Sequence, residues 1–169
     1  MSYVPERRHR RTIRLPGYDY ASSGAYFVTL VAKDRECLFE NDANRAAVER
    51  AWLALPATNT HVKLDTYVVM PNHFHGILWL DDPRRGGSRT APTDASKPRK
   101  PLGRLIGAFK TTSTKAINLL RDSPGVPVWQ RNYYERVIRN EDELNRVRQY
   151  ILDNPANWDE DVENPATKA

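Results

Sequence analysis

Apolar residues in this chain follow two different spacings, and the change from one to the other marks out the expected elements. Runs rich in β-branched and aromatic residues predict strands over residues 26–31, 62–70, 73–80 and 129–138. Apolar residues spaced three or four apart predict helices over residues 42–55, 102–120 and 142–154. Pro71 and Asn72 favour a tight turn, so the second and third strands should form an antiparallel hairpin.

The order strand, helix, hairpin, helix, strand, helix predicts an α+β fold. We expect a ferredoxin-like or RRM-like sandwich, in which helices cover an antiparallel sheet. The chain of 169 residues is long enough for one domain with its own core, so residues 1–169 should form a single domain with a basic N-terminal arm at 1–15. Residues 82–101 combine prolines, glycines and basic residues without apolar periodicity, which predicts a flexible basic loop.

Basic residues are unevenly distributed and favour a polyanionic partner. The net charge is +5 and the isoelectric point is near 9.4. Between Arg84 and Arg121, ten basic residues are opposed by one acid, Asp94. The arm adds further arginines against the single acid Glu6, namely Arg7, Arg8, Arg10, Arg11 and Arg14. Neutralised phosphates release counterions, so we expect nucleic acid as the partner, although a solvated basic surface would give the same pattern.

Cysteine content and hydropathy limit the expected metal chemistry and location. The single cysteine, Cys37, excludes an internal disulfide and a multi-cysteine zinc site. No apolar run approaches the roughly 20 residues of a membrane helix, and the basic N-terminus lacks the apolar stretch of a signal peptide. We therefore expect a cytoplasmic protein with no membrane partner.

His73 and His75 are the sharpest candidates for a metal site. They begin an expected strand, where positions two apart point to the same face, so both imidazoles can reach one ion while Phe74 faces the other side. A structural role without metal is an open alternative for such a pair. The other histidines in the chain are His9 and His61, and His9 lies in the arm.

Tyr150 and Asn154 are the second candidate pair. They lie about one turn apart on the last expected helix, beside an apolar stripe formed by Leu144, Val147 and Ile151. A structural alternative fits the same spacing, with Tyr150 as a partly buried aromatic residue and Asn154 as a capping residue.

Several ordered motifs together resemble a known family. These are VVMPNHFHGI at 68–77, WQRNYYERVIR at 129–139 and YILDNP at 150–155, which are similar to the single-tyrosine HUH transposases. RLPGYDY at 14–20, followed by YFVT at 26–29, resembles the REP-associated tyrosine transposases in particular. The resemblance covers most of the chain and leaves out residues 82–101 and the extreme C-terminus.

The resemblance implies a site and a reaction. His73 and His75 would be ligands of Mg²⁺ or Mn²⁺, and Tyr150 would be the nucleophile that forms a 5′-phosphotyrosine. Asn154 would be the third metal ligand, at a position where many relatives in the wider family carry glutamine. Tyr133 and Tyr134 are rival nucleophiles by residue type, but they lie in an expected strand without a same-face amide partner.

The resemblance also implies the substrate, a single-stranded DNA hairpin with a short unpaired segment at its foot. Phosphate pairing and base stacking favour a set of DNA-binding candidates: Arg10, Arg11, Arg14, Tyr18, Tyr20 and Lys110. The family leaves open whether the protein is a monomer or a homodimer that exchanges the tyrosine helix.

Two other functions are weighed against this one. The first is a non-catalytic module that binds nucleic acid on the same sheet and keeps the histidines for structure. The second is a metal-dependent hydrolase of small molecules, which requires a further acidic or histidine ligand near His73 and His75. A covalent protein–DNA adduct would separate the transposase from both.

Overall fold

The computed structural model describes residues 17–81 and 100–168, and it confirms the expected α+β sandwich. The strands are β1 (Gly24–Val31), β2 (Val62–Val69), β3 (His73–Leu80) and β4 (Tyr134–Ile138). The main helices are α1 (Asp42–Leu53), α3 (Leu102–Leu120) and α4 (Glu141–Asp153), and α2 (Leu55–Thr58) is a single turn. The predicted arm at 1–15 and nearly all of the predicted loop at 82–101 lie outside the described residues.

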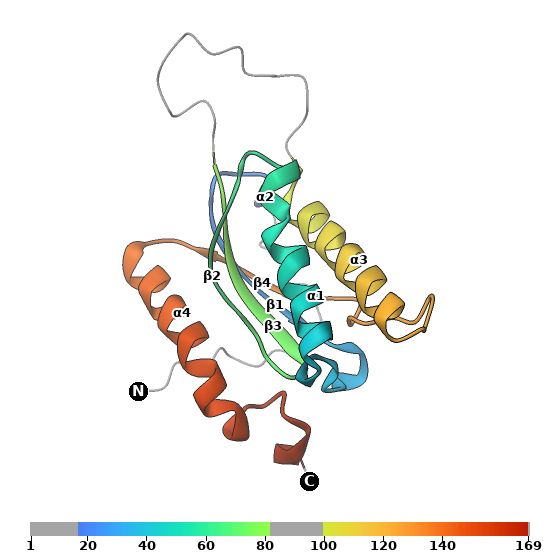
Figure 1. Ribbon diagram of the computed structural model, residues 1–169. Helices are drawn as coiled ribbons and strands as arrows, with labels where there is room; N and C mark the ends of the chain where they lie inside the picture. Colours follow the sequence, from blue (N-terminus) through green and yellow to red (C-terminus); the bar gives the residue numbers. More distant parts are fainter. Residues whose placement is uncertain (1–16, 82–99, 169) are drawn as a thin grey trace.

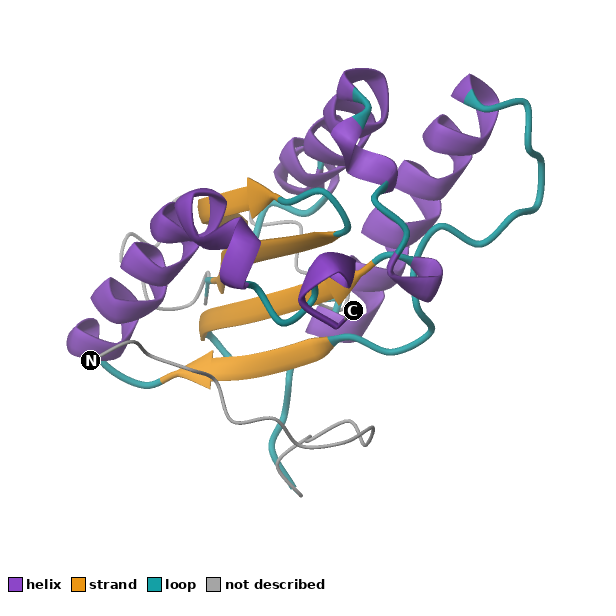
Figure 2. Ribbon diagram, turned by 90° about the horizontal axis from the view of Figure 1, so that it is seen from below, coloured by secondary structure: helices purple, strands orange, loops and turns teal. Residues whose placement is uncertain are grey.

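The strands form one sheet in the order β2-β3-β1-β4, and all neighbours are antiparallel. Helices α1 and α3 cover one face and α4 covers the other (Figure 1). Seen from below, α4 again lies apart from α1 and α3, and the C-terminal segment lies across the end of the sheet (Figure 2). No helix in the described part of the chain is long and apolar enough to cross a membrane.

Alternation along β3 assigns its side chains to two separate cores. Phe74 and Leu78 belong to the core beneath α1 and α3, where Phe74 contacts Trp52 at 4.7 Å between ring centroids. Ile77 and Trp79 belong to the smaller core beneath α4. Because His73 and His75 have the same parity as Ile77, the sheet turns both imidazoles toward α4.

The last strand is shorter than expected. We predicted a strand over 129–138, but regular pairing begins at Tyr134, and Trp129 forms only an isolated bridge with Ala32. Lys110 supplies the physical reason, because its ammonium donates hydrogen bonds to the carbonyls of Gln130 (2.8 Å) and Arg131 (3.1 Å). Carbonyls that accept from a lysine side chain are turned away from the ladder of the sheet.

The segment after α4 was not anticipated. Residues Asn154–Glu160 and Pro165–Lys168 form two further 3-10 helices. This segment turns back toward the start of β3 and brings Trp158 to within 6.0 Å of His73, measured between ring centroids. It therefore forms part of the surroundings of the histidine pair.

Gly76, between the two cores, should not tolerate a side chain. A Cβ there would lie 2.8 Å from side-chain atoms of Phe74 and Trp52, which are both fully buried. We expect Gly76→Ala to lower the free energy of unfolding by about 1–3 kcal/mol in a urea titration, because overpacking strains a dense core. Gly107→Ala is the control, since nothing lies within 4 Å of its Cβ and alanine favours the helix. Equal stability of the two variants would contradict this packing.

Candidate active site

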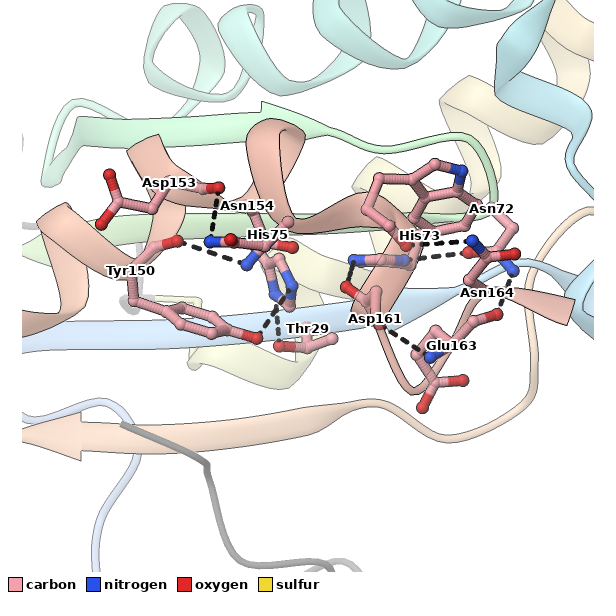
Figure 3. Close-up of polar contacts among 12 residues, drawn as sticks. Thr29, Asn72, His73, His75, Tyr150, Asp153, Asn154, Asp161, Glu163 and Asn164 are labelled. Carbon is pink, nitrogen blue, oxygen red and sulfur yellow. Dashed lines mark hydrogen bonds and ion pairs between the residues drawn. The ribbon is translucent and has the colours of Figure 1, made fainter. Parts of the chain in front are cut away.

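The two histidines of the HFH motif meet beneath α4. His73 is fully buried and His75 is 4% exposed, and their ring centroids are 4.6 Å apart. In Figure 3, both imidazoles lie between α4 and the sheet, with Tyr150 on one side and Asp161 on the other.

Asn72 fixes the tautomer of His73. The amide nitrogen of Asn72 donates to the carbonyls of Arg35 (3.1 Å) and Glu163 (2.7 Å), so its oxygen is the atom that faces His73 Nδ1 at 2.9 Å. An amide oxygen only accepts hydrogen bonds, so His73 Nδ1 carries the proton and Nε2 carries the lone pair. His73 Nε2 is buried and has no hydrogen-bond partner among the described residues.

His75 is held by the neighbouring strand. The register pairs His75 with Thr29, whose hydroxyl lies 2.8 Å from His75 Nδ1, and Phe27 stacks on the imidazole at 5.6 Å. His75 Nε2 points toward the hydroxyl of Tyr150, 3.5 Å away. The hydroxyl oxygen of Thr29 can accept a hydrogen bond from Nδ1–H, which leaves the lone pair of Nε2 as the second one at the site.

Burial keeps both imidazoles neutral near pH 7. It lowers the pKa of His75 well below the usual value, and the neighbouring His73 lowers it further. Burial also lowers the pKa of His73, while Asp161 and Glu163, and then Asn154, act in the opposite direction. Neutral imidazole is the form that binds metal ions.

Helix α4 supplies Tyr150 and Asn154. The ring of Tyr150 packs edge-on against His75 at 5.3 Å and against Phe27 at 6.1 Å. Asn154 caps the helix and is buried, and its amide nitrogen donates to the carbonyl of Tyr150 at 3.3 Å. Its Oδ1 is buried without a hydrogen-bond partner in the described ranges. The helix thus presents a hydroxyl and an amide oxygen to the same site.

Three of these atoms fit a divalent cation. His73 Nε2, His75 Nε2 and Asn154 Oδ1 all offer lone pairs, and two of them are buried without a partner in the described part of the chain. Within residues 17–81 and 100–168, no three His, Cys, Asp or Glu side chains are grouped closely enough to hold a metal. The third ligand to the histidine pair is therefore best supplied by an amide oxygen.

The other two tyrosines are placed differently. Tyr134 pairs with Thr29 across β1 and β4, and its ring packs against Phe27 at 6.2 Å, so it lies on the α4 face of the sheet. Tyr133 packs against the core beneath α1 and α3. The hydroxyl of Tyr150, the third candidate nucleophile, lies 3.5 Å from His75 Nε2.

Asp65 ties α4 to strand β2 next to the site. Its carboxylate accepts two hydrogen bonds from Arg148, at 2.9 and 2.6 Å, and one from the indole of Trp79 at 3.0 Å. Arg148 and the other donors outweigh burial and hold the pKa of Asp65 well below its usual range. This ion pair positions the helix that carries Tyr150.

Removing the charge of Asp65 should destabilise the protein in a pH-dependent way. We expect Asp65→Asn to cost about 1.5 kcal/mol, the lower end for charged hydrogen bonds because the side chain of Arg148 is 35% exposed. The pKa of Asp65 is lowered on folding, so its contribution is complete above the unfolded value of about 3.9 and is lost as the pH falls below it. Urea titrations at pH 7 and pH 3 should show the difference shrinking.

Asp81→Asn is the matched control for Asp65→Asn. Asp81 pairs with Lys63, but the two side chains are 40% and 71% exposed, so its loss should cost well under about 1 kcal/mol. Equal effects of the two substitutions would show that the Asp65 pair does not hold α4.

The DNA-binding candidates do not cluster at this site. Tyr18 and Tyr20 pack together at 5.0 Å, and the hydroxyl of Tyr18 lies 3.3 Å from that of Tyr26. They precede Gly24, which pairs with Leu80 at the far end of β3 from His73. Both rings pack against the core beneath α1 and α3, on the face of the sheet opposite the histidine pair. Arg10, Arg11 and Arg14 lie outside the described residues.

The ammonium of Lys110 contacts other residues of the fold. Besides its two carbonyl contacts, its ammonium lies 5.4 Å from the ring centroid of Tyr133, and burial lowers its pKa to about 8. Sequence reasoning placed Lys110 among the DNA contacts, and that role stays a prediction. Sequence reasoning also missed Asn72 as a partner of the site, and Asp161, whose carboxylate lies 3.7 Å from His73 Nε2.

Comparisons with known proteins place these features in context. No family model matches the chain. An uncharacterised protein of Haemophilus influenzae is 34% identical over 167 residues, which cover 90% of this chain and 92% of that protein. A REP-associated tyrosine transposase bound to a REP hairpin has a similar fold, with a TM-score of 0.58, 17% identity and coverage of 91% of this chain and 74% of the other. A candidate transposase from Deinococcus radiodurans R1 gives a TM-score of 0.51 and 16% identity over 88% and 97% of the two chains.

Proposed function

We propose that this chain, which belongs to the same protein family as the uncharacterised Haemophilus influenzae protein and has the fold of a REP-associated tyrosine transposase, is itself a DNA transposase. It would cut and rejoin single-stranded hairpin DNA through a covalent bond between Tyr150 and a 5′-phosphate. The observation that carries the proposal is the contact of the Tyr150 hydroxyl with His75 Nε2 at 3.5 Å, beside the buried Nε2 of His73, which has no hydrogen-bond partner among the described residues.

The residues of the site suit a divalent ion of the Mg²⁺ or Mn²⁺ class. His73, His75 and Asn154 would hold it, and when bound it would supply Lewis-acid chemistry to an oxygen of the scissile phosphate. Asn72 and Thr29 prepare the two histidines by keeping the proton on Nδ1 and the lone pair on Nε2.

Tyr150 would carry out the covalent step. The phenol gives up its proton to water as its oxygen attacks the phosphorus, the bond from phosphorus to the 3′-oxygen breaks, and the leaving oxygen takes up a proton from water to become a free 3′-hydroxyl. The phosphodiester energy is kept in the phosphotyrosine, so a 3′-hydroxyl can reverse the step and rejoin a strand without a nucleotide cofactor. Phe27 and His75 hold the phenol ring on two sides, which limits the orientations of the attacking oxygen.

One chain contains the whole constellation. Tyr150 from α4 and the histidines from β3 meet within a single copy, packed over the core that Ile77 and Ile151 share. We propose that Tyr150 acts at the histidine pair of its own chain.

Labelled hairpins test the proposal directly. A pool of hairpins with randomised foot sequences is incubated with the protein and Mn²⁺, then denatured and separated by electrophoresis. A 3′ label should move with the protein, and a 5′ label should appear on a shorter free strand, because the tyrosine retains the 5′-phosphate of the downstream fragment. Hairpin binding without any adduct would favour the non-catalytic module instead.

A further inference from the structure

The C-terminal segment brings a carboxylate to the histidine pair. Asp161 Oδ2 lies 3.7 Å from His73 Nε2, and the side chain of Asp161 is 12% exposed. Figure 3 shows Asp161 pointing at His73 from the side opposite Tyr150. The proposed function does not use this residue.

The contact joins two acceptors. Asn72 Oδ1 accepts a hydrogen bond from His73 Nδ1–H, so the lone pair of Nε2 faces the carboxylate oxygen of Asp161. The buried Oδ1 of Asn154, also without a hydrogen-bond partner in the described ranges, adds a third acceptor near His73. Acceptors that converge in a buried place repel one another unless a cation or a proton lies between them. A divalent cation close to these three atoms would relieve that repulsion.

Hydrogen bonds and an ion pair fix the position of the C-terminal segment beside the site. Glu163 N donates to Asp161 Oδ1 at 2.7 Å, which leaves Oδ2 as the oxygen that faces His73. The carbonyl of Asp161 accepts hydrogen bonds from Asn164 N and from the hydroxyl of Thr167. Asn72 reaches the carbonyl of Glu163, and Arg35 forms an ion pair with its carboxylate at 2.5 Å. Asn72 thus orients both His73 and the segment that carries Asp161.

We infer that Asp161 is a further donor to the divalent ion held by His73, His75 and Asn154, and that it acts through a water molecule of the ion, because His73, His75 and Asp161 are not grouped closely enough for all three to ligate one ion directly. Mg²⁺ and Mn²⁺ prefer oxygen ligands and usually keep several waters, so a carboxylate 3.7 Å from the histidine nitrogen suits them. Asp161 would add a negative charge to an otherwise neutral ligand set. The inference rests on the proposed function, because it presupposes the metal site.

Metal binding without DNA tests the role of Asp161. Mn²⁺ is titrated calorimetrically into the full chain and into Asp161→Asn, Asp161→Ala and the control Asp159→Asn, which changes an exposed aspartate of the same segment. We expect the affinity for Mn²⁺ to fall about tenfold or more in both Asp161 variants and to stay unchanged in the control. Asp161→Asn keeps an acceptor for Glu163 N, so it should preserve the fold, as circular dichroism and the melting temperature would show.

Each outcome decides one of the two proposals. Wild-type affinity, or a higher affinity, in folded Asp161 variants overturns the inference and leaves the proposed function intact. Absence of Mn²⁺ binding by the wild-type chain overturns the metal-dependent function itself.

If the Asp161 variants do not fold, carbon NMR of the wild-type chain tests whether Asp161 interacts with the ion. Mg²⁺ should shift the carboxyl resonance of Asp161 and not that of Asp159, and an unmoved Asp161 resonance overturns the inference.

Discussion

Tyr150→Phe should stay folded and bind hairpin DNA, but it should form no covalent adduct. Phenylalanine keeps the ring that packs against Phe27 and His75 and removes only the oxygen, so the free energy of unfolding should change by about 1 kcal/mol or less. Loss of the nucleophile should lower cleavage on the order of 10⁴-fold or more, below detection on a denaturing gel. Fluorescence anisotropy with a labelled hairpin should show unchanged binding.

Tyr134→Phe is the matched control for this prediction. Tyr134 lies on the same face of the sheet, and its ring also packs against Phe27, but it extends from strand β4 rather than from the helix. Adduct formation by Tyr134→Phe should equal that of the wild type. Peptide mapping of the wild-type adduct gives an independent answer. DNA on Tyr133 or Tyr134, or an adduct formed by Tyr150→Phe, would show that the nucleophile is misassigned.

The site elements could be predicted because strand and helix periods are fixed by backbone geometry. A period of two places His73, His75 and Ile77 on one face of β3, and the structure has them facing α4. The helical period likewise predicted that Leu144, Val147 and Ile151 form the buried stripe of α4, with Tyr150 at its border. In both cases the direction of the side chain is set by residues close to it in sequence, so the local spacing of apolar residues is enough to predict it.

The rest of the site depends on partners that are distant in sequence. Asn72 was read as a turn residue, but its amide reaches the carbonyls of Arg35 and Glu163, which are 37 and 91 positions away. The Asp65 and Arg148 pair spans 83 positions, and Asp161 comes from a segment without regular periodicity. No local pattern distinguishes such residues from solvated polar ones before the fold is known.

The position of Tyr18 and Tyr20 changes how a hairpin would be held. The sequence predicts one footprint, yet these tyrosines pack against the core beneath α1 and α3, on the face of the sheet opposite the histidine pair. If Tyr18 and Tyr20 contact DNA, they would contact a part well away from the phosphate that Tyr150 attacks.

Replacing both His73 and His75 with alanine should abolish cleavage and leave hairpin binding largely intact. The two imidazoles supply the nitrogen ligands of the proposed ion, so the double variant should lose adduct formation on the order of 10⁴-fold or more and give no calorimetric signal with Mn²⁺. Chelation of metal by EDTA should have the same effect on the wild type. Both residues are buried, and the cavities should lower the free energy of unfolding by a few kcal/mol, about 2–4.

Because of that cost, the assays should be run at low temperature on protein shown by circular dichroism to be folded. His61→Ala is the control, since His61 precedes β2 and its Nε2 lies 3.4 Å from the carbonyl of Lys100, away from the pair. It should cleave and bind Mn²⁺ as the wild type does. Undiminished cleavage by the double variant would refute the metal assignment for His73 and His75. Loss of hairpin binding by a folded double variant would instead place the two histidines in the DNA interface, because binding to phosphates and bases by the basic surface does not require the ion.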